Sequence, residues 1–97
     1  MQFDWDDEKN RTNLEKHGVS FELASYVFDD PLHRSVPDPY EHEERWRTIG
    51  VVENRMTILV VHTVVEIQGE EELVRIISAR LATGYERRAY EESEQEF

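Results

Sequence analysis

Basic side chains beside a histidine near the amino terminus have the composition of a phosphate-handling site. Lys9 and Lys16 stand seven positions apart, so they share one face if this segment is helical. His17 follows Lys16, and a histidine next to a lysine can act as a general base or stabilise phosphate charge. The alternative is that Lys16 and His17 only occupy the last turn of a helix, where the dipole favours positive charge.

Two arginines flank Trp46 in the middle of the chain. On a strand, Arg45 and Arg47 would share one face and Trp46 would point to the other. Two arginines on one face can bind a phosphate, whereas the tryptophan suits the core. The carboxylates that could instead pair with these arginines are those of Glu41, Glu43 and Glu44.

A third basic stretch begins at Arg75 and ends with the arginines at positions 87 and 88. Strand alternation places Ile76, Ser78 and Arg80 on one face, and Arg75, Ile77 and Ala79 on the other. Arg80 ends this stretch just before a predicted helix, whose amino end is a ready site for an anion. Arg80 is therefore the residue that most strongly indicates phosphate binding.

The remaining histidines favour structure over metal binding. His62 lies in an apolar run, which is typical of a hydrogen-bonded core histidine. His42 has carboxylates beside it, but the chain has no pair of histidines four residues apart and no repeated ligand spacing. We therefore predict no metal site.

The first third of the chain predicts a strand followed by two helices. Residues 2–5 can form a short strand, and Asp6 is a suitable N-cap for a helix that Gly18 ends. Ser20 can cap a second helix, which should stop at Asp30 because a residue before proline disfavours helix. The core face of that helix should comprise Phe21, Ala24, Val27 and Phe28.

The rest of the chain predicts strands and a closing helix. Residues 33–44 indicate an edge strand and an exposed loop, and strands follow over 45–52, 56–65 and 73–81. Thr83 and Glu86 form a capping-box pattern that opens a helix through about Glu94. The expected fold is α+β, with a small antiparallel sheet, two N-terminal helices and one C-terminal helix, in the order β-α-α-β-β-β-β-α.

Length and composition narrow the class of protein. The 97 residues suffice for one domain, 1–97, and no cysteine is present, which excludes disulfides, thiolate nucleophiles and cysteine-based metal sites. The longest apolar run is far too short for a membrane span, and the acidic amino terminus lacks signal-peptide features. We expect a cytoplasmic protein that does not bind membranes.

The net charge of −11 argues against nucleic acid only on average. Fifteen of the 22 acidic residues fall in the two termini and in two short clusters, at 38–44 and 70–72. The remaining seven acids stand against 11 bases. A basic surface for RNA and an acidic surface for a basic partner are therefore both possible.

Two motifs together resemble those of the BrnT family of bacterial type II toxins. They are Lys16-His-Gly-Val-Ser-Phe21 and Arg75-Ile-Ile-Ser-Ala-Arg80, and further matches run from Phe3 to Glu91 in the family's order. The resemblance implies a RelE-like fold and an endoribonuclease that cleaves mRNA by 2′-OH attack, without metal or other cofactor. Such cleavage inhibits translation and arrests growth.

The resemblance also suggests which residues act. The implied catalytic set is Lys16, His17, Arg45, His62 and Arg80, with His17 or Lys16 transferring the proton. We assign substrate binding to Lys9, Arg47, Arg75, Ser78 and Arg87.

The implied partner is a BrnA-like DNA-binding antitoxin, and operator DNA would be reached only through the toxin–antitoxin complex. The high acidity is unusual for a ribonuclease. An alternative is therefore a weak or inactive toxin-fold module that binds the antitoxin and regulates its operon.

Overall fold

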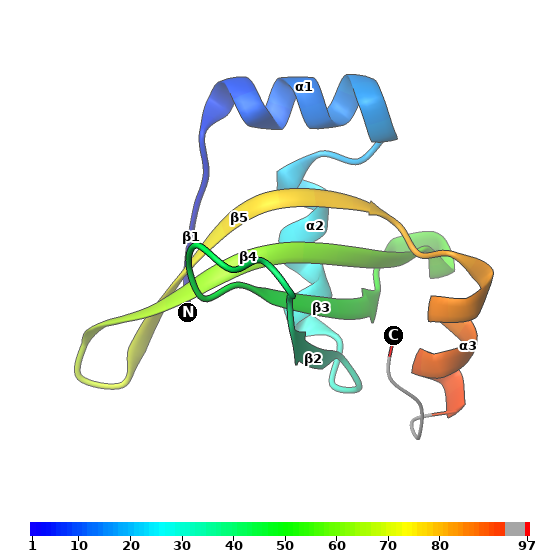
Figure 1. Ribbon diagram of the computed structural model, residues 1–97. Helices are drawn as coiled ribbons and strands as arrows, with labels where there is room; N and C mark the ends of the chain where they lie inside the picture. Colours follow the sequence, from blue (N-terminus) through cyan, green and yellow to red (C-terminus); the bar gives the residue numbers. More distant parts are fainter. Residues whose placement is uncertain (93–96) are drawn as a thin grey trace.

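A five-stranded sheet with the strand order β1-β5-β4-β3-β2 forms the centre of the computed structural model (Figure 1). The structure describes residues 1–92 and 97. The strands are β1 (Gln2–Asp4), β2 (Arg34–Pro37), β3 (Trp46–Val51), β4 (Thr57–Gln68) and β5 (Glu71–Leu81). The predicted edge strand and the strands after it are thus present, with shifted ends.

The sheet is mixed, which corrects the prediction of an antiparallel sheet. β1 runs parallel to β5, with Phe3 opposite Val74, while all other neighbouring strands are antiparallel. No hairpin constrains the direction of β1, because two helices carry the chain from it to the far edge of the sheet. Residue alternation reports which face a side chain takes but not the direction of the strand.

Local capping explains where the helices begin and end. Asp6 caps α1 (Asp7–His17) by accepting the Lys9 N–H at 3.0 Å, and Gly18 ends it with a left-handed φ of 72°. Ser20 caps α2 (Phe21–Ser25), which continues as the 3-10 turn η1 (Tyr26–Asp29) and stops before Asp30 and Pro31. These boundaries are as predicted.

The closing helix α3 spans Gly84–Glu92 and begins with the predicted capping box. The Glu86 N–H donates to Thr83 Oγ1 at 3.1 Å, and the Thr83 N–H donates to Glu86 Oε1 at 2.8 Å. Its predicted extension to Glu94, like Glu96 of the acidic terminus, lies outside the described residues. Among the described helices, none is long and apolar enough to cross a membrane.

The sheet has a core on each face. Phe21, Ala24 and Val27 from α2 and η1 bury one face, together with Val60 and Ile76 of the sheet. Ile49 and Leu59 on the other face pack against Ala89 of α3 and against Phe97. The second turn, η2 (Glu53–Arg55), joins β3 to β4.

A β-bulge in β5 corrects the predicted alternation. Val61 pairs with Ser78 but His62 pairs with Ile76, so Ile77 is an extra residue in β5. Ile76 and Ala79 consequently both enter the core beneath α2. Arg75, opposite Thr63, therefore shares a face with Ser78 and not with Ala79. A bulge leaves no reliable mark in composition, which is why strict alternation gave the wrong faces.

Candidate active site between α1 and β5

A groove between α1 and the exposed edge of β5 brings together four of the predicted site residues. Its volume is about 340 Å³. Lys9, Lys16 and His17 reach it from α1, and Ser78 reaches it from β5. The other lining residues are Glu8, Thr12, Asn13 and Ile77. Residues far apart in sequence thus meet at one place on the surface.

Asn13 holds the helix in position above the strand. Its side-chain amide donates to the Ala79 carbonyl at 2.7 Å and to the Val19 carbonyl at 2.9 Å, and its Oδ1 accepts the Ala79 N–H at 3.2 Å. The buried amide thereby occupies backbone groups at the edge of β5, where β1 no longer pairs. Sequence reasoning missed this residue, although it lies on the face between Lys9 and Lys16.

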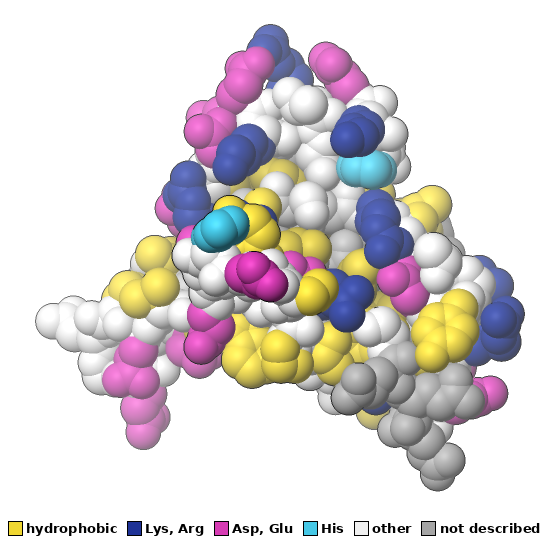
Figure 2. Space-filling view, viewed as in Figure 1, with side chains coloured by type: hydrophobic (Ala, Val, Ile, Leu, Met, Phe, Trp, Pro, Cys, Tyr) yellow, Lys and Arg dark blue, Asp and Glu magenta, His cyan; other side chains and the backbone are white. Residues whose placement is uncertain are grey.

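The basic groups of α1 are exposed and available to a ligand. Within the described part of the chain, no hydrogen bond or ion pair engages the side chains of Lys9, Lys16 or His17. In Figure 2, Lys and Arg side chains and a histidine gather over α1 and continue toward α3. Three basic groups beside a hydroxyl have the composition needed to bind and react with a phosphodiester.

The sheet face beside the groove carries three more of the predicted residues. Ser78 and Arg47 both stand opposite Val61, from strands on either side of it, and Arg75 and Arg80 share the face of Ser78. Neighbouring strands lie about 4.8 Å apart, so the backbone at Arg47 lies about 10 Å from the backbone at Ser78, two strands away. The bulge at Ile77 is what brings Arg75 onto this face.

The guanidinium of Arg80 binds the carboxylate of Glu86, near the start of α3. Its two terminal nitrogens donate to the two oxygens of Glu86 at 2.8 and 2.9 Å. Hydrogen bonding to Arg80 lowers the pKa of the Glu86 carboxyl to about 2, and the same bonds raise the pKa of Arg80. Glu86 was recognised in the sequence only as a helix cap, yet it also fixes the guanidinium.

Comparisons with known proteins decide the family. The family described as "Ribonuclease toxin, BrnT, of type II toxin-antitoxin system" matches residues 5–86, which include α1 and β5. The chain belongs to the BrnT family.

A solved BrnT structure supports the assignment. The chain is similar to the ribonuclease toxin BrnT of Brucella abortus, with 26% sequence identity and a TM-score of 0.57. The similarity covers 86% of this chain and 97% of the Brucella chain. A search of curated proteins finds no match. This chain is therefore a ribonuclease toxin of the type II toxin–antitoxin class.

Three arginines predicted for the site are paired within this BrnT-family chain. Arg45 binds Glu43 at 2.7 Å and stacks over the Tyr40 ring at 3.7 Å. The other two pairs are Arg47 with Asp38, at 3.6 Å, and Arg75 with Asp4. The alternative considered for Arg45, pairing with a nearby glutamate, is what the structure has.

Arg87 and His62 stand apart from the groove. Arg87 is exposed on α3. His62 is only 2% exposed and faces the core beneath α2. Its Nε2 lies 2.6 Å from Thr48 Oγ1, and burial lowers its pKa to about 4. His62 is thus a neutral, hydrogen-bonded core histidine at neutral pH, as its apolar neighbours predicted.

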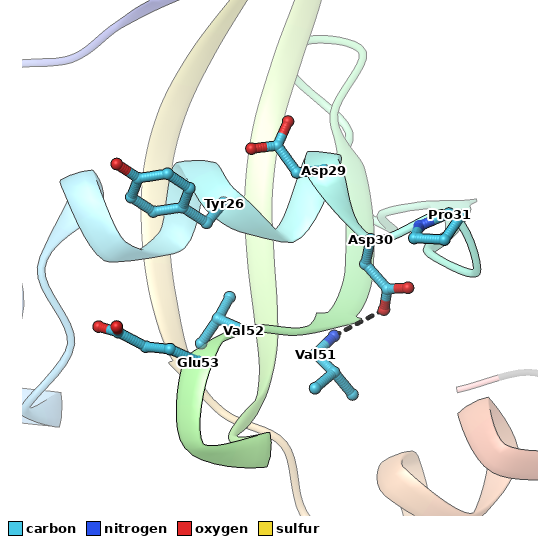
Figure 3. Close-up of a pocket in the computed structure, with 7 residues that line it drawn as sticks. All are labelled: Tyr26, Asp29, Asp30, Pro31, Val51, Val52 and Glu53. Atoms are coloured by element: carbon cyan, nitrogen blue, oxygen red, sulfur yellow. Dashed lines mark hydrogen bonds between the residues drawn. The ribbon is translucent and has the colours of Figure 1, made fainter.

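A cavity beside η1 contains none of the predicted residues. It measures about 520 Å³ and is lined by Tyr26, Asp29, Asp30, Pro31, Val51, Val52 and Glu53 (Figure 3). Asp30 Oδ2 accepts the Val51 N–H at 2.8 Å and also the Tyr90 hydroxyl. Carboxylates without a basic side chain make this cavity unsuited to phosphate. Across the described residues, no group of three or more His, Asp or Glu side chains could hold a metal ion.

Proposed function

We propose that this chain is a metal-independent endoribonuclease that cleaves mRNA in the groove between α1 and β5. The observation that carries the proposal is the gathering of Lys9, Lys16 and His17, all without partners in the described structure, around Ser78. The positive charge of the two lysines can bind the phosphodiester, and the imidazole of His17 can accept or donate a proton.

The reaction follows RelE-like chemistry. The 2′-oxygen of the ribose attacks the adjacent phosphorus and loses its proton to the unprotonated ring nitrogen of His17 or, in place of its charged form, to the uncharged amine of Lys16. The new bond joins the 2′-oxygen to phosphorus while the bond from phosphorus to the 5′-oxygen breaks. The 5′-oxygen takes up a proton from the protonated form of the other of these two groups. The products are a 2′,3′-cyclic phosphate and a 5′-hydroxyl, and Lys9, with Arg75 and Arg80 on the neighbouring face, stabilises the charge on the phosphoryl oxygens.

Cleavage of a fluorescent RNA oligonucleotide by the purified chain tests this function. Lys16→Ala and His17→Ala should each slow cleavage about 100-fold or more, because each removes a proton-transfer or charge-stabilising group. Arg11→Ala is the matched control, since Arg11 is also exposed on α1 but pairs with Glu8 and does not line the groove. Equal rates for all three variants, or loss of cleavage with EDTA, would contradict the proposal.

The partner we propose is a BrnA-like DNA-binding antitoxin that neutralises the chain in the cytoplasm and carries it to operator DNA. Induced expression of the chain by itself should arrest growth, and co-expression of the adjacent antitoxin gene should restore it. Growth unaffected by the chain would count against an active toxin.

One observation favours a second candidate, a weak or inactive toxin that only regulates its operon. Four arginines predicted for the site, at 45, 47, 75 and 80, each form an ion pair with a carboxylate of the same chain. Such pairing reduces the positive charge presented to RNA. Antitoxin binding without detectable RNA cleavage would select this alternative.

A further inference from the structure

A second pocket opens on the sheet face opposite the proposed active site. It has a volume of about 400 Å³ and is built where η1 and the strands around His62 meet. His62 and Val74 line it, and Val74 belongs to the core beneath α2. The pocket is therefore separate from the groove, whose Ser78 faces the other way.

Aromatic rings form walls of this pocket. Phe28, His33 and Trp46 all line it. The Phe28 ring lies 6.0 Å from the His33 ring and 5.0 Å from the His62 ring, centre to centre. Flat rings of this kind are the surfaces on which proteins stack unpaired nucleobases.

A chain of hydrogen bonds connects the pocket to the core. Ser35 Oγ lies 2.7 Å from Thr48 Oγ1, which lies 2.6 Å from Nε2 of the buried His62. Ser35 is exposed and lines the pocket. Its hydroxyl can both donate and accept, so it can bind a ligand edge that carries both kinds of group.

Two carboxylates at the pocket have no partner in the structure as described. Glu44 and Glu72 are exposed and line the pocket, and no Lys or Arg side chain does; Met1 also lines it, with its terminal ammonium paired to Glu71 at 2.7 Å. The two unpaired carboxylates attract N–H donors. A carboxylate accepts from two neighbouring N–H groups at once, which the guanine edge provides through N1–H and the exocyclic amine.

We propose that this pocket is a nucleobase-binding site with a preference for guanine. The base stacks on the aromatic walls. Glu44 or Glu72 accepts hydrogen bonds from its N–H groups, and the Ser35 hydroxyl donates to an acceptor atom on the edge of the base. A lysine or arginine of a protein partner is the other ligand that acids and rings attract, but such side chains only donate and could use the Ser35 hydroxyl only as an acceptor. The inference rests on the proposed action on RNA, because it assigns a base preference to that substrate.

Fluorescence of Trp46 can measure binding directly, independently of cleavage. Trp5 packs against Phe21 elsewhere, so Trp5→Phe leaves Trp46 as the only tryptophan reporter. Titration with guanosine monophosphate should quench it saturably. Inosine monophosphate, which lacks only the exocyclic amine, should bind several-fold more weakly, and ribose 5-phosphate should have no effect.

Variants distinguish the carboxylates from general charge. In the Trp5→Phe background, Glu44→Gln or Glu72→Gln should weaken guanosine monophosphate binding about tenfold, the cost of a hydrogen bond to a charged group. Glu70→Gln is the control. It also removes one negative charge, but Glu70 lies in the β4–β5 turn and does not line the pocket.

The outcomes separate the alternatives. No quenching by any nucleotide, or equal binding of guanosine and inosine monophosphates, would overturn the proposed site. Quenching only by N-acetyl-arginine amide would assign the pocket to a protein partner and overturn it as well. Guanine binding by a chain that cleaves no RNA would support this site while rejecting the proposed ribonuclease activity.

Discussion

Glu86 contributes both to the start of α3 and to the position of Arg80. It accepts two hydrogen bonds from the guanidinium and one from the Thr83 N–H, and its side chain is 9% exposed. A buried carboxylate in this geometry fixes the direction of the remaining guanidinium N–H groups. Glu86 therefore determines where the Arg80 charge lies and in which direction its free N–H groups point.

Replacing Glu86 separates these two roles. Glu86→Gln should lower the rate constant of RNA cleavage about tenfold with a smaller change in KM, because Arg80 loses its orientation. Thr83→Ala is the control, since it removes a hydroxyl from the cap but leaves the pair with Arg80. It should cost about 1 kcal/mol of stability and leave cleavage intact. Equal rates for the two variants at matched stability would show that Glu86 only caps the helix.

His62 should make stability depend on mild acid. Its pKa is about 4 in the folded chain against 6.5 in the unfolded chain, because burial disfavours the imidazolium. Below pH 6.5 the unfolded state binds the proton first, so the contribution of His62 to folding stability should fall between pH 6.5 and 4 by up to about 3 kcal/mol.

Urea unfolding measured at several pH values tests this dependence. His62→Asn keeps a group able to bond Thr48 but cannot titrate, so its stability should be flat from pH 6.5 to 4.5. A wild-type slope retained in the variant would assign the effect to other groups.

At the scale of elements, the packing of η1 against β3 depends on a glycine. A Cβ added at Gly50 would lie 2.9 Å from Val27 Cγ1 and 3.0 Å from the Val27 carbonyl oxygen. Gly50→Ala should therefore destabilise the chain by about 1–3 kcal/mol, as overpacking does. Thermal unfolding measures the loss.

Gly84 provides the comparison for this substitution. A Cβ there would meet only the flexible end of Arg88, at 3.4 Å. Gly84→Ala, at the start of α3, should leave stability unchanged or raise it slightly. If both alanines behaved alike, close approach at Gly50 would not be the cause.

The elements show what the sequence could and could not predict. Caps at Asp6, Ser20 and Thr83 defined helix starts correctly, because capping is a local interaction between residues three apart. The direction of β1 and the extra residue at Ile77 depend on partners elsewhere in the chain, which local patterns do not report. For the same reason, the groove residues of α1 were recognised individually, while Asn13 and the second role of Glu86 were not.

The whole molecule distributes its charge differently from a simple division into two faces. Acidic residues pair with Arg45, Arg47, Arg75 and Arg80, whereas in the described part of the chain no carboxylate pairs with the lysines of α1. These ion pairs leave the net charge of −11 unchanged, and exposed basic side chains lie both on α1 and on α3, where Arg87 is exposed.

The excess of acidic residues should make the affinity for the antitoxin depend on salt concentration. Affinity for a basic antitoxin segment should weaken as salt rises from 50 to 500 mM, since exposed charges are screened over a shorter distance. Isothermal titration calorimetry at each salt concentration measures the change. Affinity that does not vary with salt would mean that apolar contacts dominate the complex.

The bulge at Ile77 also determines how the gene can change. Losing that single codon keeps the reading frame and removes only one aliphatic residue. Because Ile76 already stands opposite His62 and Arg75 opposite Thr63, the shortened strand would keep Val74 and Ile76 in the core and Arg75 on the other face. Inheritance can therefore shorten β5 at this one position without exchanging the inside and the outside of the protein, and the loss would remove only the local bend of the bulge.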